Sequence, residues 1–339
     1  IPRVYAMGRD HSLLTFPQLL GKFFDGRVAF VAGIICVVGY LGFTSSQLLA
    51  GAKLASAAVD GLDLGTALLI MGAVTVGYTV LGGMKAVVYT DTIQWVVLLT
   101  GLAFIGVPMA WVAVGGWEAI RNTVEPSMLR LDNITAIQLI NWGVTIVPIW
   151  FVGMTLYQRI YASRSEKEAR IAWFIAGLLE WPVMAFLGVL LGMLAKVAAD
   201  QGLLDAVLTT GEVIDPEMGL PLLLRAILPV GLMGIMLSVY FSAILSTADS
   251  CLMAASGNLL TDIVKRFRPS RNLRHTLRLS QIFTLVLGAI AIAIAAVMEN
   301  VLSLMLHSYA FMVSCLLVPL VAAVFFGQRN PYAALAAMI

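Results

Sequence analysis

The sequence is poor in charged residues, cysteine and histidine, and each scarcity excludes a class of protein. Asp, Glu, Lys and Arg together make up 12% of the 339 residues, where soluble domains carry roughly 25%. The three cysteines all lie in apolar segments, so they indicate neither a disulfide framework nor a metal-binding pattern. The sequence has only three histidines and neither a Gly-x-Ser-x-Gly nor a His-Glu-x-x-His motif. We therefore expect no enzymatic activity. The formal net charge of +2 points to no partner, and we expect no nucleic-acid binding.

Hydrophobic residues, in contrast, make up 60% of the chain, and the mean hydropathy is +0.94. This composition predicts an all-α integral membrane protein, because a chain in lipid must satisfy its backbone hydrogen bonds internally. We expect a single transmembrane domain over residues 1–339, with a ninth span beginning near Tyr332. Ile1 is no natural start and Ile339 lies within an apolar run, so we expect a sequence cut at both ends. Eight apolar runs are long enough to cross a bilayer, at about 28–52, 64–81, 86–114, 134–157, 171–197, 229–261, 279–298 and 301–326.

The basic residues predict how these spans are oriented. Sixteen of the 21 Lys and Arg residues lie in alternate loops, and loops rich in Lys and Arg are cytoplasmic. We therefore expect a multi-pass protein of the cell membrane with residues 1–27, 82–90, 158–170 and 262–278 in the cytoplasm. The acidic 198–225 loop then lies outside. The sequence LPLLLRAIL, residues 220–228, begins within this loop and predicts a short interfacial helix.

The sixth apolar run carries a cluster of small hydroxyl residues. Ala243, Ser246, Thr247 and Ser250 stand at positions i, i+3, i+4 and i+7, so they share one helix face. Asp249 lies beside that face, and acids inside a membrane usually face a bundle interior or an aqueous cavity. Hydroxyl and carbonyl oxygens suit small hard cations, which predicts a sodium site. The alternative is that these hydroxyls bond to their own helix and allow close packing.

Two other runs contain unusual residues. The fourth is interrupted by Gly143, Pro148 and Gly153. Such interruptions free backbone groups that transporters use to hold substrate and ions, although an ordinary proline kink is equally compatible with them. Asp91 lies about one turn inside the third run, either as an acid favoured by the helix dipole or on an ion exit path. Glu180 is a further intramembrane acid, for which the sequence indicates no partner.

Four motifs, in this order, resemble the solute:sodium symporter family: LTFPQLLGKFF, YTVLGGMKAVVYTDTIQ, YQRIYASRSEKEAR and AILSTADSCLMAASGNLLTDI. The resemblance implies a leucine-transporter-type bundle of five-plus-five inverted repeats, of which core helices 3 to 10 are present. It implies a sodium site formed by the Ala243 carbonyl, Ser246 and Thr247, with Na⁺ as the coupling ion and no other cofactor. It also implies a second ion or an ion-exit path at Asp91, Asp249 and Ser250.

The resemblance further implies sodium-coupled symport of a small organic solute, such as an amino acid, a sugar, a carboxylate or a choline-like molecule. The residues expected to line the solute site are Trp150, Gly153, Thr155, Tyr157 and Tyr309. In the family, core helix 1 completes both sites. No such helix precedes Ile1, so we expect residues 1–339 alone not to transport. Two alternatives stay open: a symporter-like sensor domain of a signalling protein, and a proton-coupled transporter in which Asp91 and Asp249 carry protons.

Overall fold

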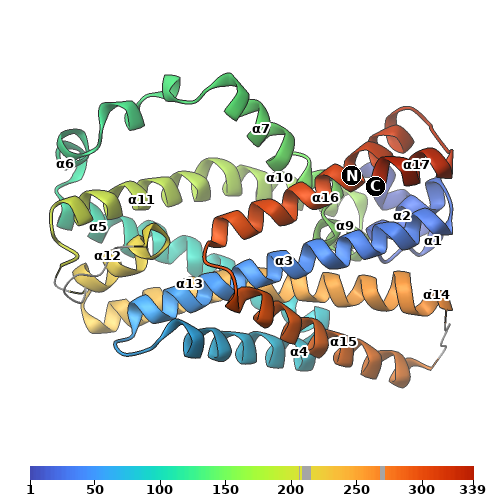
Figure 1. Ribbon diagram of the computed structural model, residues 1–339, viewed down its shortest axis with the longest axis horizontal. Helices are drawn as coiled ribbons and strands as arrows, with labels where there is room; N and C mark the ends of the chain where they lie inside the picture. The colour runs from blue at the N-terminus through green and yellow to red at the C-terminus, as the bar shows by residue number, and fades with distance from the viewer. Residues whose placement is uncertain (206, 208–214, 268–271) are drawn as a thin grey trace.

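The computed structural model describes residues 1–205, 207, 215–267 and 272–339. It is an elongated bundle whose long helices run mostly along one axis (Figure 1). Within the described residues, eight helical stretches are long and apolar enough to cross a membrane: Gly26–Ala58, Leu64–Gly83, Val87–Val114, Ala136–Ala162, Glu166–Asp200, Val230–Phe267, Leu273–Ala296 and Val301–Phe325. Each overlaps one of the eight predicted runs. The prediction of a multi-pass, all-helical membrane protein is confirmed, and α17 (Pro331–Met338) follows where the ninth run begins.

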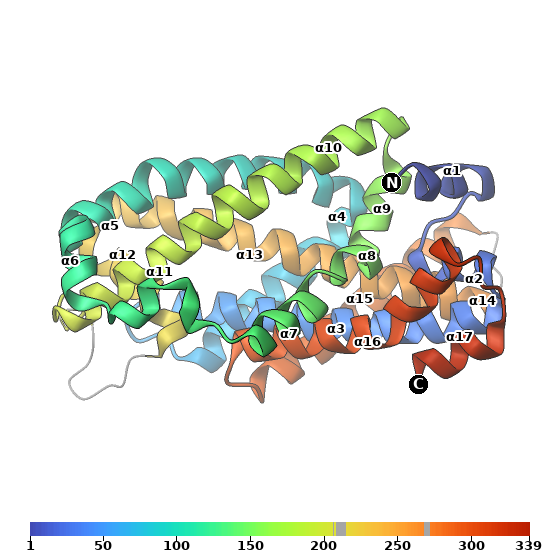
Figure 2. The same cartoon turned by 90° about the horizontal axis from the view of Figure 1, so that it is seen from above.

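The helix α3 (Gly26–Ala58) lies at the centre of the bundle. It begins where the Asp25 carboxylate accepts hydrogen bonds from the backbone of Arg27 and Val28, at 2.8 and 3.0 Å. It packs against α4 (Leu64–Gly101), α13 (Val230–Asn258), α15 (Leu273–Ala296) and α16 (Val301–Phe325), as Figures 1 and 2 show from two directions. Of the eight spans within the described residues, α3 therefore has the largest share of its residues buried.

The helix α4 joins two spans through a break at Gly83. This glycine has φ of 60° and ψ of −176°, a conformation that other residues rarely adopt. The predicted loop over 82–90 is thus helical except at this point. The second span is completed by a π-helical turn, η1 (Leu102–Gly106), and by α5 (Val107–Val114).

The predicted interruption of the fourth run is present. The chain forms α7 (Ala136–Ile146), α8 (Ile149–Val152) and α9 (Met154–Ala162), with breaks at Pro148 and Gly153. Gly143, in contrast, lies within α7 and interrupts nothing. At the second break the backbone N–H of Thr155 donates to the Tyr40 hydroxyl at 3.2 Å, so α3 supplies a partner to the interrupted helix.

The fifth span consists of α10 (Glu166–Leu179), the π-helical turn η4 (Glu180–Met184) and α11 (Ala185–Asp200). The predicted interfacial helix is α12 (Gly219–Ile227), which packs against α11 and α5. Short elements complete the chain: α1 (Pro2–His11), α2 (Phe16–Phe23), α6 (Gly116–Thr123), η2 (Pro126–Leu129), η3 (Leu131–Asn133), η5 (Pro216–Met218), η6 (Leu259–Val264) and α14 (Lys265–Phe267).

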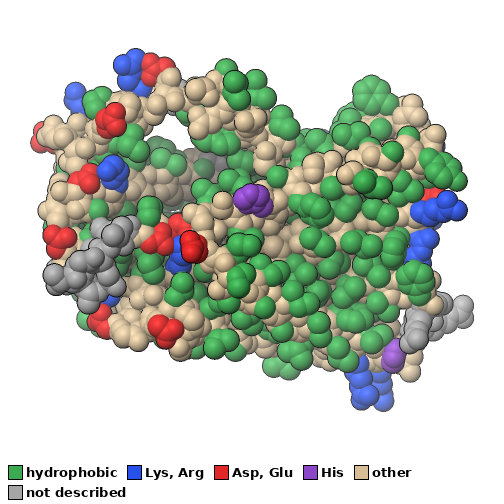
Figure 3. All heavy atoms as spheres, in the orientation of Figure 1, with side chains coloured by type: hydrophobic (Ala, Val, Ile, Leu, Met, Phe, Trp, Pro, Cys, Tyr) green, Lys and Arg blue, Asp and Glu red, His purple; other side chains and the backbone are tan. Residues whose placement is uncertain are grey.

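Charged side chains gather at the two ends of the molecule. Figure 3 shows Asp and Glu mainly at the end that holds α6 and α12, and Lys and Arg at the end that holds α14, with hydrophobic side chains between them. This separation fits a body that crosses a bilayer with a basic side in the cytoplasm. The direction of crossing stays a prediction.

Candidate ion and solute site

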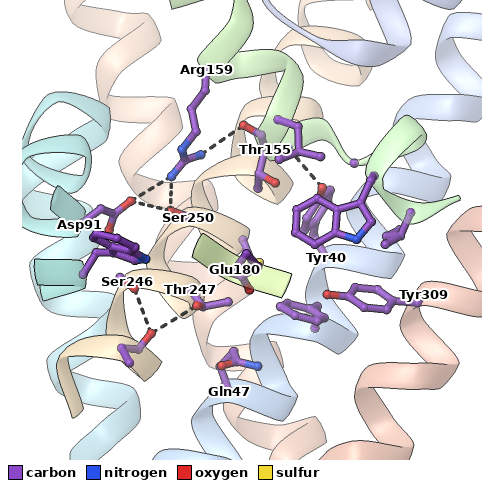
Figure 4. A pocket seen from close by; sticks show the side chains of 18 of the residues that line it. Tyr40, Gln47, Asp91, Thr155, Arg159, Glu180, Ser246, Thr247, Ser250 and Tyr309 are labelled. Atoms are coloured by element: carbon purple, nitrogen blue, oxygen red, sulfur yellow. Dashed lines mark hydrogen bonds and ion pairs between the residues drawn. The ribbon is translucent and has the colours of Figure 1, made fainter. Parts of the chain in front are cut away.

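A cavity of about 560 Å³ lies between α3, α4, the interrupted helix α8–α9, the turn η4, α13 and α16. Figure 4 shows polar side chains from these elements pointing into it. The break at Gly153, the residue Ile149 that follows the break at Pro148, and the π-turn of the fifth span all border this space. Irregular backbone at membrane depth is tolerated where it lines a cavity, which explains why the interruptions gather here.

The three residues predicted to bind sodium lie together on one wall of the cavity. The Ala243 carbonyl oxygen accepts hydrogen bonds from Ser246 Oγ at 2.9 Å and from Thr247 Oγ1 at 3.2 Å (Figure 4). Both hydroxyls therefore make the local bonds of the alternative interpretation. A hydroxyl that donates to its own helix keeps two lone pairs, so the same geometry leaves oxygen ligands for a cation. The sodium role stays a prediction.

Next along the same face, Ser250 belongs to an ion-pair network with Asp91 and Arg159. The Arg159 guanidinium donates to Asp91 Oδ2 at 2.9 Å, to Ser250 Oγ at 2.8 Å and to the Thr155 carbonyl at 3.1 Å. Ser250 Oγ also lies 3.3 Å from Asp91 Oδ2. Asp91 and Ser250, two of the three residues predicted for a second ion or an ion-exit path, are thus brought together, and the Arg159 guanidinium lies between them. Their role in ion binding or exit stays a prediction.

Asp249 lies apart from this network. Its side chain is fully buried and accepts a hydrogen bond from the Tyr78 hydroxyl, which also lies 3.2 Å from Thr90 Oγ1. Tyr78 and Thr90 stand on either side of the Gly83 break in α4. Asp249 does not line the cavity, so within the described residues it connects α13 to α4.

Four of the five residues predicted to line the solute site lie on the cavity wall: Trp150, Gly153, Thr155 and Tyr309. The structure places the fifth, Tyr157, in the core instead. Its ring packs against Phe16 with centroids 4.8 Å apart, and its hydroxyl donates to the Phe151 carbonyl at 2.7 Å. Tyr309 stacks on Phe43, with centroids 4.9 Å apart and planes 13° apart.

Sequence reasoning missed several wall residues. Tyr40, Phe43 and Gln47 of α3 line the cavity, and so does Arg159, which the sequence indicated only as a loop charge. The i, i+3, i+7 spacing of the α3 residues placed them on one face, but only the packed bundle shows what that face meets. Glu180 was recognised as an intramembrane acid without a partner, and it also lines this cavity.

Comparison with known proteins gives a consistent result. The sequence model of the Sodium:solute symporter family matches residues 3–339. Sodium/glucose cotransporter 1 of Ovis aries is 28% identical over 352 residues, which cover 92% of this chain and 52% of that protein. Solute carrier family 5 member 4 of Rattus norvegicus is 26% identical over 355 residues, with 92% and 52% covered. The chain thus spans about half the length of the curated relatives that it matches.

Among solved structures, a Na⁺-coupled sialic acid symporter in a substrate-bound outward-open state superimposes with a TM-score of 0.76. The match covers 100% of this chain and 78% of the other, at 19% identity. At that identity the likeness shows the fold, and it confirms the leucine-transporter-type bundle expected from the sequence. The family consists of transporters, in agreement with the expectation that the chain is not an enzyme. This chain belongs to the sodium:solute symporter family.

Proposed function

We propose that the full-length protein couples inward sodium flow to the uptake of a small organic solute by alternating access. The observation that supports this most directly is the convergence of the Ala243 carbonyl, Ser246 Oγ and Thr247 Oγ1 on one wall of the cavity. The aromatic rings of Trp150 and Tyr309 line the same cavity. A cation at the hydroxyls and a solute at the aromatic rings then share one space, so each changes the affinity for the other.

Asp91 and Ser250 serve the exit of the ion in this proposal. The guanidinium of Arg159 lies 2.9 Å from Asp91 and 2.8 Å from Ser250, so it already supplies the positive charge there. A sodium ion that moves from Ser246 towards Asp91 competes with this guanidinium. Such competition favours release over a second permanently occupied site.

The experiment is uptake by the full-length protein in proteoliposomes, with a panel of labelled solutes and with sodium or potassium outside. We expect accumulation only under an inward sodium gradient. The double variant Ser246→Ala, Thr247→Ala should raise the sodium concentration for half-maximal uptake by about tenfold, because coupling energies of about 1–3 kcal/mol are typical. Ser238→Ala is the matched control, since this hydroxyl bonds to Gly234 of the same helix and does not line the cavity.

An unchanged sodium dependence in the double variant would contradict the ion site. Accumulation driven by a proton gradient in potassium would favour the proton-coupled alternative, with Asp91 and Asp249 as its candidate carriers. Solute binding without accumulation under any gradient would favour a sensor domain.

A further inference from the structure

Glu180 is a carboxylate in the middle of a membrane span, at the first residue of the π-helical turn η4. Acids at this depth are costly and generally face a cavity or a partner, and π-turns occur frequently at functional sites. Glu180 lines the cavity together with Met184 of the same turn. It forms no hydrogen bond or ion pair with any residue that the structure describes. Neither the sodium site nor the Asp91 network uses it.

The charges of the cavity wall leave Glu180 without compensation. Among its described residues, the wall carries three charged side chains: Asp91, Arg159 and Glu180. Arg159 pairs with Asp91 at 2.9 Å and also donates to Ser250 and to the Thr155 carbonyl. The one cation among the described wall residues is therefore already neutralised by a carboxylate, whereas the Glu180 carboxylate faces no such counter-charge.

The aromatic side chains that line the cavity also favour a cationic solute. In the view of Figure 4, Glu180 is drawn between Thr247 and the ring of Tyr309, and all three residues line the cavity. Tyr309 stacks on Phe43, and Trp150 also lines the cavity. The face of an aromatic ring attracts an ammonium group, most strongly where water is excluded. A carboxylate and three rings around one space form a site for an organic ammonium ion.

We propose that Glu180 selects the solute by its charge, so that the cavity takes a small organic cation such as an amine or a quaternary ammonium compound. This inference rests on the proposed function, because it assigns the solute of the same cavity. It makes Glu180 a specificity-determining residue that contacts the solute, and it leaves the coupling ion to Ser246 and Thr247.

The first experiment measures binding to the full-length protein by isothermal titration calorimetry, with matched probes. Choline and larger quaternary ammonium ions are each compared with the neutral compound in which carbon replaces nitrogen, and with a carboxylate of the same size. We expect the cations to bind about tenfold to a hundredfold more tightly, as the partly screened Coulomb attraction of one carboxylate allows. Glu180→Gln should abolish this preference. Glu166→Gln is the control, because this exposed acid of α10 pairs with Arg170, at 3.8 Å, and does not line the cavity.

A second experiment needs no knowledge of the solute. A cysteine introduced by Thr155→Cys is labelled with a trimethylammonium-ethyl and with a sulfonatoethyl methanethiosulfonate reagent. The rates are taken as the increase over the parent protein, because Cys251 also lines the cavity. We expect the cationic reagent to react faster, and the ratio of the two rates to fall about tenfold when Glu180→Gln is added. A ratio that is independent of Glu180 overturns the proposal.

The outcomes separate this inference from the proposed function. If a neutral or anionic solute binds most tightly and is taken up with sodium, the inference fails and the proposed function holds. If Glu180→Gln weakens sodium dependence equally for every solute, Glu180 serves the coupling ion and the inference fails. If cations are selected through Glu180 but their uptake does not depend on sodium, the proposed function fails and the inference stands.

Discussion

Lys53 is the buried cation whose replacement should be most damaging to stability. It belongs to α3, and its side chain is only 6% exposed. Its Nζ lies 2.6 Å from Asp215 Oδ2 and 2.6 Å from Glu217 Oε2. Glu217 in turn accepts the backbone N–H groups of Val301 and Leu302, both at 3.0 Å, at the start of α16. One ammonium thus connects α3, the loop before α12 and the N-terminus of α16.

Lys53→Met removes the charge and keeps most of the apolar stem. Breaking a buried ion pair from one side costs about 3–5 kcal/mol, because the remaining charge loses its partner. The side chains of Asp215 and Glu217 are 35% and 20% exposed, so water compensates in part and we expect a loss of about 3 kcal/mol. The control is Lys196→Met. This exposed lysine pairs with Asp200 at 3.0 Å on the surface of α11, and it should cost less than about 1 kcal/mol.

The loss should also depend on pH. Burial raises the pKa of Asp215 and Glu217, but the hydrogen bonds and the charge of Lys53 outweigh it and hold both pKa values below the ordinary 3.8 and 4.5. A carboxyl whose pKa is lowered by folding stabilises the folded state above its unfolded pKa, and this contribution disappears as the pH falls through the folded pKa. The difference between wild type and Lys53→Met should therefore be full at pH 7 and shrink below about pH 4.5.

The assay is unfolding of the full-length protein by denaturant at a fixed detergent composition, at pH 7 and at about pH 3, below the ordinary pKa values of both carboxyls. We expect Lys53→Met to lose about 3 kcal/mol at pH 7, and the gap to wild type to narrow at the lower pH. Equal, small losses in Lys53→Met and Lys196→Met would refute the reasoning about burial. A gap of constant size at both pH values would refute the assignment of the two carboxylates.

Two further perturbations test the packing around the site. Tyr78→Phe leaves the buried Asp249 carboxyl without its hydroxyl partner, so unfolding measurements should show that the free energy of unfolding falls by about 1–3 kcal/mol. Most of this loss should be recovered when Asp249→Leu is combined with Tyr78→Phe. A double variant that is less stable than the sum of the two single effects would contradict this. Gly288→Ala drives a methyl group into the side chain of Val76 on α4 and should destabilise by about 1–3 kcal/mol. Gly77→Ala meets no atom within 4 Å and should stabilise the protein by roughly 0.5–1 kcal/mol. If both glycine variants changed the stability in the same direction, the result would count against the close contact between α4 and α15.

The spans could be predicted because lipid imposes one local requirement, a long apolar helix, on each of them. The shared face of Ala243, Ser246 and Thr247 could also be predicted, since helix geometry alone places these residues together. The same geometry explains why Tyr157 does not line the cavity. Thr155 and Tyr157 are two residues apart on α9, and residues at that spacing point in nearly opposite directions. One lines the cavity, so the other is turned into the core.

Local sequence patterns do not predict contacts between distant segments. The partners of Lys53 stand 162 and 164 residues further along the chain, and no periodicity links them. Glu180 and Met184 stand at i and i+4, so helix geometry places them on one face. Which segments that face meets depends on the packed bundle, although the cost of a mid-membrane acid did indicate that Glu180 has a function.

The adjacent residues Asp249 and Ser250 make contacts on different sides of α13. Successive residues of a helix point about 100° apart, so Ser250 faces the cavity while Asp249 faces α4. Ser250 continues the face of Ser246, and Arg159 bridges it to Asp91. Under the proposed function, an ion leaving Ser246 along that face reaches a carboxylate that is already neutralised by an arginine. The guanidinium then restores its pairing with Asp91 once the ion departs, so in this proposal the network lowers the cost of an empty site without holding the ion.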